Sequence, residues 1–202
     1  MNDYIVRAAR ADEAEVIATL IMEAMNHECC QWFAGPDHTL SDFHRLMTEL
    51  VRRTDSQYSY LNTSVAVISS QVVGICITYD GGKLHQLRRA FVEASLRELG
   101  MDHSSMDDET QAGELYIDSL CVAEPYRRKG IATALIHDSI EKARTQGLPA
   151  VGLLVDNDNP RAEHFYRRLG FTHIDNNTWG SHPMKHMVYK SGPRPWATDS
   201  IE

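Results

Sequence analysis

The chain has 202 residues, 43% of them hydrophobic and 24% charged, which is typical of one globular domain with its own core. Its net charge of −8 excludes the extended basic surface that general nucleic-acid binding requires, so we expect no nucleic acid partner. Because no apolar run approaches the ~18 residues of a membrane span, and the N-terminus lacks a secretion signal, we expect a cytoplasmic protein with no membrane partner.

The N-terminal part predicts a strand, two helices and a hairpin. Residues 4–9 have the composition of a short strand, and Asp12 with Glu15 has capping-box spacing ahead of an amphipathic helix. A second helix is predicted over residues 40–53 from apolar side chains at three- and four-residue steps. The runs "TSVAVIS" and "VVGICITYD" flank a tight turn and predict an antiparallel hairpin.

The remaining elements alternate between helix and strand. A helix, "KLHQLRRAFVEASLREL", ends at Gly100 and leads into an acidic loop, so that residues 82–112 form a helical insertion between strands. "ELYIDSLCV" predicts a strand, residues 131–146 a helix capped by Gly147, and "AVGLLVD" a central strand covered on both sides. A short helix at residues 161–169 precedes the strands "GFTHID" and "MKHMVYK".

These elements predict one α/β (α+β) domain over residues 1–190, with a mixed, mostly antiparallel central sheet and helices on both faces. Residues 191–202, which contain Pro193 and Pro195, are predicted to be a loose tail. The last strand offers an edge that either pairs with a second copy, giving a homodimer, or is blunted by its lysines.

The cysteines and histidines predict no metal site. Cys29 and Cys30 are adjacent, while the other two cysteines lie in separate predicted strands, so we expect reduced, buried thiols. His182 and His186 have helical spacing, but Pro183 breaks a helix there, and no compact cluster of further ligands completes a site.

The segment "PYRRKGIATALI" concentrates positive charge ahead of a predicted helix. Its three cations, Arg127, Arg128 and Lys129, precede Gly130, which allows close backbone approach. Helix N-termini carry unpaired N–H groups, so this turn is suited to hold a diphosphate. The spacing matches neither a Walker loop nor a GxGxxG fingerprint. By itself the segment is equally compatible with a solvated turn.

A second segment, "VDNDNPRAEHFYRRLGF", follows the "AVGLLVD" strand, and together the two segments resemble the GNAT superfamily of acyl-CoA N-acyltransferases. The family's R/Q-x-x-G-x-G/A turn is similar to residues 127–132, with alanine in the last slot, and Leu120, Val122 and Pro125 fit the preceding pattern. The family's N-x-x-A-x-x-x-Y-x-x-x-G-F pattern is met at Asn159, Ala162, Tyr166, Gly170 and Phe171. The resemblance covers residues 114–171.

The resemblance implies acetyl-CoA as co-substrate and no metal. It places the pantetheine arm along the end of one strand and the diphosphate on the turn that follows. The cofactor-binding residues it implies are Leu120, Cys121, Val122, Arg127, Arg128, Lys129, Gly130, Ile131, Ala132, Thr133, Asn159 and Tyr166. Asn159 has a second interpretation, because an asparagine before a helix also serves as its N-cap.

The resemblance also implies that Tyr166 is the acid that protonates the departing thiolate. The other interpretation is that Tyr166 belongs to the apolar face of a short helix. For the base, Glu114 and Asp118 alternate onto one face of a predicted strand, where carboxylates are costly unless paired or functional. Asp118 is the first choice and Glu114 the second, and a chain of water molecules is the alternative.

The resulting hypothesis is an N-acetyltransferase that moves acetyl from acetyl-CoA to a primary amine of a small molecule or peptide by direct attack. The alternatives are a non-catalytic CoA-binding sensor or docking domain, and an enzyme that acetylates protein lysines or N-termini. We expect the acceptor pocket near the "CCQWFAGPDH" link and the insertion, with Trp32, Phe33 and "DHSSMDDE" either contacting substrate or serving as loop packing.

Overall fold

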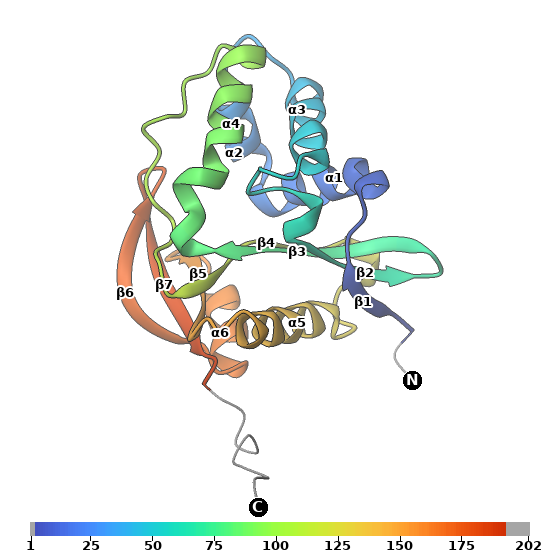
Figure 1. The fold of residues 1–202 in the computed structure, drawn as a ribbon, viewed down its shortest axis with the longest axis vertical. Helices are drawn as coiled ribbons and strands as arrows, with labels where there is room; N and C mark the ends of the chain where they lie inside the picture. Colours follow the sequence, from blue (N-terminus) through green and yellow to red (C-terminus); the bar gives the residue numbers. More distant parts are fainter. Residues whose placement is uncertain (1–2, 193–202) are drawn as a thin grey trace, which may run out of the picture.

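A seven-stranded sheet forms the centre of the computed structural model, which describes residues 3–192 (Figure 1). The strands are β1 (Ile5–Ala8), β2 (Thr63–Ile68), β3 (Gln71–Asp80), β4 (Glu114–Val122), β5 (Ala150–Asp156), β6 (Thr172–Trp179) and β7 (His182–Lys190), in the order β1-β2-β3-β4-β5-β7-β6. Only β4 and β5 pair in parallel. The predicted mixed, mostly antiparallel sheet is confirmed.

Helices cover both faces of the sheet, as predicted (Figure 1). One face carries α1 (Ala14–Met25), α2 (His27–Ala34), α3 (Leu40–Arg52) and α4 (Leu84–Leu99), and the other carries α5 (Ile131–Thr145) and α6 (Pro160–Arg168). Each layer buries its own apolar core, with Phe43 and Phe91 in the first and Leu135 and Phe171 in the second. The sheet therefore lies between two layers of helices, which cover β4 on its opposite faces.

Helix α2 was not predicted, because most of its residues belong to the segment that was expected to link the first two predicted helices. Eight residues are too few for a clear helical period, yet Cys30, Phe33 and Ala34 are buried at helical spacing. Asn26 caps the helix by accepting a hydrogen bond from the backbone N–H of Cys29 at 3.0 Å. Tertiary burial of one face thus supplies what the short sequence signal lacks.

The start of α1 differs from the prediction. The capping contact comes from Glu13, whose carboxylate accepts a hydrogen bond from the backbone N–H of Arg10 at 2.8 Å, rather than from the predicted pair of Asp12 and Glu15. A short 3-10 turn, residues 11–13, precedes the helix, so that α1 begins only at Ala14. The predicted strand and helix are otherwise present.

The C-terminal hairpin is longer than predicted. β6 continues through Trp179 and β7 begins at His182, joined by Gly180 and Ser181 in left-handed conformations. The polar residues of β6 are mostly exposed and give no alternating hydrophobic pattern, which is why its second half was missed. Of the predicted tail, residues 193–202 lie outside the described part of the chain.

β4 and β5 pair over three residues and then separate. The last pair joins Tyr116 to Gly152, although β4 continues to Val122. On its other side β4 contains a β-bulge, because Ile117 and Ser119 pair with successive residues of β3 and leave Asp118 without a partner there. The bulge lies at Asp118 itself, and Tyr116 interacts electrostatically with both Asp118 and Glu114, so the predicted alternation of Glu114 and Asp118 onto one face stays a prediction.

Candidate active site

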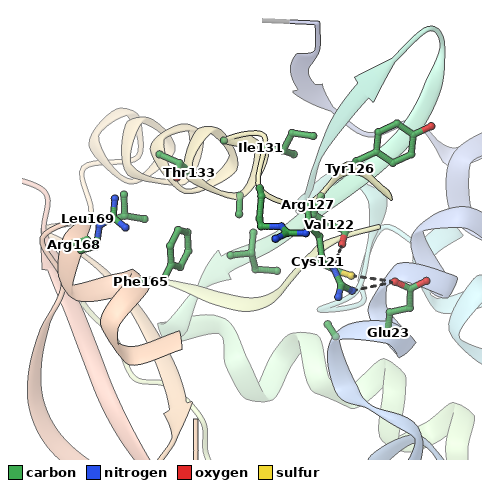
Figure 2. Close-up of a pocket in the computed structure, with 15 residues that line it drawn as sticks. Glu23, Cys121, Val122, Tyr126, Arg127, Ile131, Thr133, Phe165, Arg168 and Leu169 are labelled. Carbon is green, nitrogen blue, oxygen red and sulfur yellow. Dashed lines mark hydrogen bonds and ion pairs between the residues drawn. The ribbon is translucent and has the colours of Figure 1, made fainter. Parts of the chain in front are cut away.

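A cavity of about 810 Å³ lies between the free end of β4 and α6, the helix that follows β5 (Figure 2). Its position follows from the separation of β4 and β5, which leaves the end of β4 without a neighbour on that side. The residues that line it are Glu23, Ala24, Leu120, Cys121, Val122, Tyr126, Arg127, Arg128, Gly130, Ile131, Ala132, Thr133, Phe165, Arg168 and Leu169.

The start of α5 forms the polar wall of this cavity. Gly130 is the N-cap residue with φ +80°, and no side chain caps the helix. The backbone N–H groups of the first turn therefore have no partner within the helix, and they lie at the positive end of the helix dipole. Arg128 and Arg168 add two cations to the lining. These groups could hold a diphosphate, and the binding of one by this turn stays a prediction.

Arg127 has a different role from its neighbour in the turn. Its Nε donates to the backbone carbonyl of Val122 at 2.8 Å, and its guanidinium lies 4.0 Å from the carboxylate of Glu23 on α1. Figure 2 shows these contacts beside Cys121. Arg127 thus ties the turn to the end of β4.

Cys121 is a protonated thiol at this site. Burial raises its pKa to about 12, and its Sγ lies 3.7 Å from the carboxylate of Glu23. A thiol that stays protonated near neutral pH is a poor nucleophile, so Cys121 is not suited to form a covalent intermediate. The other cysteines are free as well, which agrees with the predicted reduced thiols.

Three of the predicted cofactor-binding residues do not line the cavity. Lys129 extends over the ring of Tyr126 at 5.3 Å from its centroid. Asn159 caps α6, because its Oδ1 accepts a hydrogen bond from the backbone N–H of Ala162 at 3.1 Å. Of its two predicted roles, the structure displays the capping one.

Tyr166 is the third of these residues, and it lies next to the cavity. Phe165 and Leu169 line the cavity from the same helix, whereas the ring of Tyr166 packs between Phe165 and Phe171, with centroid distances of 5.3 and 5.7 Å. Burial raises the pKa of Tyr166 above its ordinary value, so the phenol carries its proton at neutral pH. A protonated phenol is the form that a general acid requires.

Asp118 occupies the bulge at the point where β4 leaves β5. It lies two residues after Tyr116, the last β4 residue paired with β5, and two residues before Leu120 of the cavity. Its carboxylate accepts hydrogen bonds from Gln57 Nε2 at 3.2 Å and Ser119 Oγ at 2.8 Å. Burial, and then the negative charge of Glu109, raise the pKa of Asp118 to about 6. A carboxyl with this pKa is suited to accept a proton near neutral pH.

Glu114, the second candidate base, is engaged elsewhere. Its carboxylate lies 2.8 Å from His186 Nε2 and accepts a hydrogen bond from Thr110 Oγ1 at 2.6 Å, while His186 Nδ1 lies 3.2 Å from Asp175. Burial lowers the pKa of His186, but the hydrogen bond and charge of Glu114, with those of Asp175, outweigh it and raise the pKa overall. The structure does not bring Glu114 to the cavity.

The acidic loop of the insertion is fixed by a buried arginine that sequence reasoning missed. Arg88 on α4 pairs with Glu109 and donates to the carbonyls of Met106 and Asp107 at 3.1 and 2.8 Å. Glu109 also accepts a hydrogen bond from the hydroxyl of Tyr79 at 2.9 Å. The loop is thus held in place beside the β6–β7 hairpin by these contacts and is not a freely solvated turn.

The two aromatic candidates for substrate contact divide between surface and core. Trp32 is 54% exposed and Phe33 is fully buried. A second hollow, of about 690 Å³, lies between the acidic loop and the β6–β7 hairpin and is lined by Asp107, Asp108, Asn157, Asn176, Asn177, Thr178 and Pro183. The acidic loop thus lines this hollow, and its contact with a substrate stays a prediction.

Sequence reasoning also missed Glu23 and the cavity face of α6. Phe165, Arg168 and Leu169 follow the i, i+3, i+4 spacing of one helical face, so the period of α6 was the available signal. Glu23 has no such signal, because α1 reaches the cavity only through the fold. Within residues 3–192, no three His, Cys, Asp or Glu side chains converge as a metal site, and no helix is long and apolar enough to cross a membrane.

Solved structures share this fold. An acetyltransferase crystal structure superposes with a TM-score of 0.76 at 24% identity, covering 93% of this chain and all of that chain. An N-acetyltransferase from Staphylococcus aureus Mu50 gives the same TM-score at 19% identity, covering 92% of this chain and all of that one. The chain thus has the fold of these acetyltransferase structures.

Sequence comparisons place the chain within that class. "Acetyltransferase Atu2258" from Agrobacterium fabrum is 42% identical over 65 residues, 32% of this chain and 46% of that protein. "GCN5-related N-acetyltransferase 6, chloroplastic" from Arabidopsis thaliana is 35% identical over 66 residues, 33% of this chain and 23% of that protein. The matches thus span less than half of either relative. Residues 21–171 match the model of the acetyltransferase (GNAT) family, and the chain belongs to that family.

Proposed function

We propose that this protein is an N-acetyltransferase that moves an acetyl group from acetyl-CoA to a primary amine of a small molecule or peptide by direct attack. Membership of the GNAT family supports acetyl transfer. The observation that carries the proposal is the cavity that joins the uncapped start of α5 to the end of β4, directly after Asp118.

The residues of this cavity fit coenzyme A. The N–H groups of Ile131, Ala132 and Thr133, together with Arg128 and Arg168, would hold the diphosphate. Leu120, Cys121 and Val122 would lie along the pantetheine arm, and Phe165 with Leu169 would pack against it from α6. Acetyl-CoA supplies the thioester whose acyl carbon the amine attacks.

Two residues would move the protons of the reaction. Asp118 takes the proton that the amine nitrogen loses, since the carboxyl lies at the start of the separation between β4 and β5 and has a pKa of about 6. Tyr166 gives a proton to the departing sulfur, since burial keeps its phenol protonated. Each group is regenerated when solvent exchanges its proton. The four free cysteines fit a cytoplasmic location for this reaction.

The proposal is tested first by calorimetric titration with acetyl-CoA, dephospho-CoA, NAD and ATP. We expect binding of acetyl-CoA and none of NAD or ATP. Release of free thiol is then followed with panels of small amines, peptides and intact proteins. Thiol release that depends on an amine supports an enzyme, and CoA binding without transfer to any panel member would leave a CoA-binding domain. Activity on intact proteins alone would instead indicate a protein acetyltransferase.

A further inference from the structure

Gln57 is a buried polar residue in direct contact with Asp118, although 61 positions separate them in the chain. It lies in the loop after α3 and is 3% exposed. Its backbone is held on both sides, because its N–H donates to the carbonyl of Leu87 on α4 at 3.3 Å and its carbonyl accepts from Asn62 Nδ2 at 3.1 Å. The side-chain amide therefore reaches the bulge from a backbone that is held in place by hydrogen bonds.

The side-chain amide of Gln57 makes one hydrogen bond to the described residues, although it has two N–H donors and an acceptor oxygen. Nε2 donates to Asp118 Oδ2, while Oε1 is buried and has no hydrogen-bond partner among the described residues. A buried carbonyl without a partner is costly, so its retention calls for a reason. A carboxamide offers both a donor and an acceptor on the same carbon, and rotation by a half turn exchanges their places.

The charged and titratable groups around Asp118 come from several elements. Glu109 of the acidic loop and Arg88 of α4 are paired with each other, and Tyr58, Tyr79 and Tyr116 are buried around them. The carboxylate of Asp118 accepts hydrogen bonds from two neutral donors, Gln57 and Ser119. The position of its carboxylate thus depends on these two side chains.

We propose that Gln57 is the positioning residue of Asp118 and serves both of its protonation states. With Asp118 ionised, Nε2 donates to Oδ2 and aims the carboxylate. After Asp118 has taken a proton, the amide turns over, and the hydrogen bond from Nε2 to Oδ2 is replaced by one in which Oε1 accepts the new O–H. The inference rests on the proposed function in one respect, namely that Asp118 is the base.

The test replaces Gln57 by methionine, which keeps the length of the side chain and removes both hydrogen-bonding groups. The titration of Asp118 is followed by NMR of the aspartate carboxyl carbons, which needs no acceptor substrate, and Asp118→Asn assigns the resonance. Because the hydrogen bond of Gln57 to the charged carboxylate is stronger than its bond to the neutral carboxyl, Gln57→Met is expected to raise the midpoint by about 0.5 to 1 pH unit. An unchanged midpoint in folded Gln57→Met overturns the inference.

A matched control and a second variant keep the test decisive. Gln31→Met removes hydrogen bonds to the carbonyls of Gly35 and His38, which do not involve Asp118. This variant is expected to leave the titration midpoint of Asp118 unchanged. If Gln57→Met does not fold, Gln57→Glu keeps the shape and brings a second carboxyl to Asp118, which raises the midpoint further. A midpoint in Gln57→Glu at the wild-type value overturns the inference as well.

Acetyl-transfer assays separate this inference from the proposed function. Gln57→Met is expected to lose activity mainly below its shifted midpoint, which a purely structural defect would not produce. If Asp118→Asn retains full transfer, Asp118 is not the base and the proposed mechanism fails. If Asp118→Asn is inactive and the midpoint in Gln57→Met is unmoved, the base stands and only the role of Gln57 is lost.

Discussion

The carboxylate of Glu114 occupies the space that a side chain at Gly152 would need. These residues lie on neighbouring parallel strands, where β4 and β5 are still paired. The glycine lets the carboxylate cross β5 and reach His186 on β7. The pair of glutamate and glycine thus fixes three strands just before β4 and β5 separate at the candidate site.

Gly152→Ala is expected to destabilise the protein by about 2 kcal/mol, because the added Cβ meets the Glu114 carboxylate and overpacks the core. Urea denaturation gives the free energy of unfolding. In a Glu114→Ala background the same change is expected to cost much less, since the clash is gone. Equal costs in the two backgrounds would contradict this explanation.

Stability is expected to fall as the pH rises through the raised pKa of His186. The folded-state pKa lies above the unfolded value of about 6.5, so the stabilisation is complete below that value and is lost above it. Denaturation midpoints between pH 5.5 and 9 measure the effect, and His186→Gln is expected to flatten the profile. His182→Gln, at a 71% exposed histidine, is the control and should leave the profile as in the wild type.

Asp118→Asn is expected to reduce acetyl transfer by about 100-fold or more, because the proton acceptor is removed. The wild-type rate should fall as the pH drops below about 6, where Asp118 becomes protonated. The free energy of unfolding should instead rise as the pH drops through this range. A carboxyl whose pKa is raised on folding lowers stability at pH values above it, so Asp118→Asn is expected to melt higher than the wild type at pH 8 and similarly at pH 4.

Arg168→Gln is expected to weaken CoA binding about 5-fold, since it removes one cation from the cavity lining. Arg167→Gln is the matched control, because the neighbouring arginine is paired with Glu163 and does not line the cavity. Calorimetry at two salt concentrations makes the comparison. Equal losses in the two variants would show that overall charge, and not the cavity, determines the affinity.

Tyr166→Phe is expected to lower turnover about 10- to 100-fold while CoA affinity changes little, because only the acidic proton is lost. Tyr189→Phe is the control, since its ring packs on Phe171 in the same cluster at 5.7 Å. Free-thiol release and calorimetry separate the two effects. Unchanged turnover in Tyr166→Phe would remove it as the acid and leave the packing interpretation.

The sequence predicted most elements and the cofactor turn because their signals are local. The strand "ELYIDSLCV" and the start of α5 at residue 131 were placed as the structure has them, since hydrophobic period, glycine and proline act over a few neighbouring residues. The helix α2 was missed because its burial comes from packing against α1 and α3. Short segments are therefore predicted only as far as their own residues specify them.

The candidate site divides along the same line. By itself the sequence determined the cationic turn before α5 and the helix that carries Tyr166, whose geometry depends on residues adjacent in the chain. Only the tertiary structure decided that a bulge sets Asp118 apart, that Gln57 reaches it, and that Glu114 turns to His186. The contacts of Gln57 and Glu114 join residues 61 and 72 positions apart, and they exist because the order and register of the strands bring distant segments together.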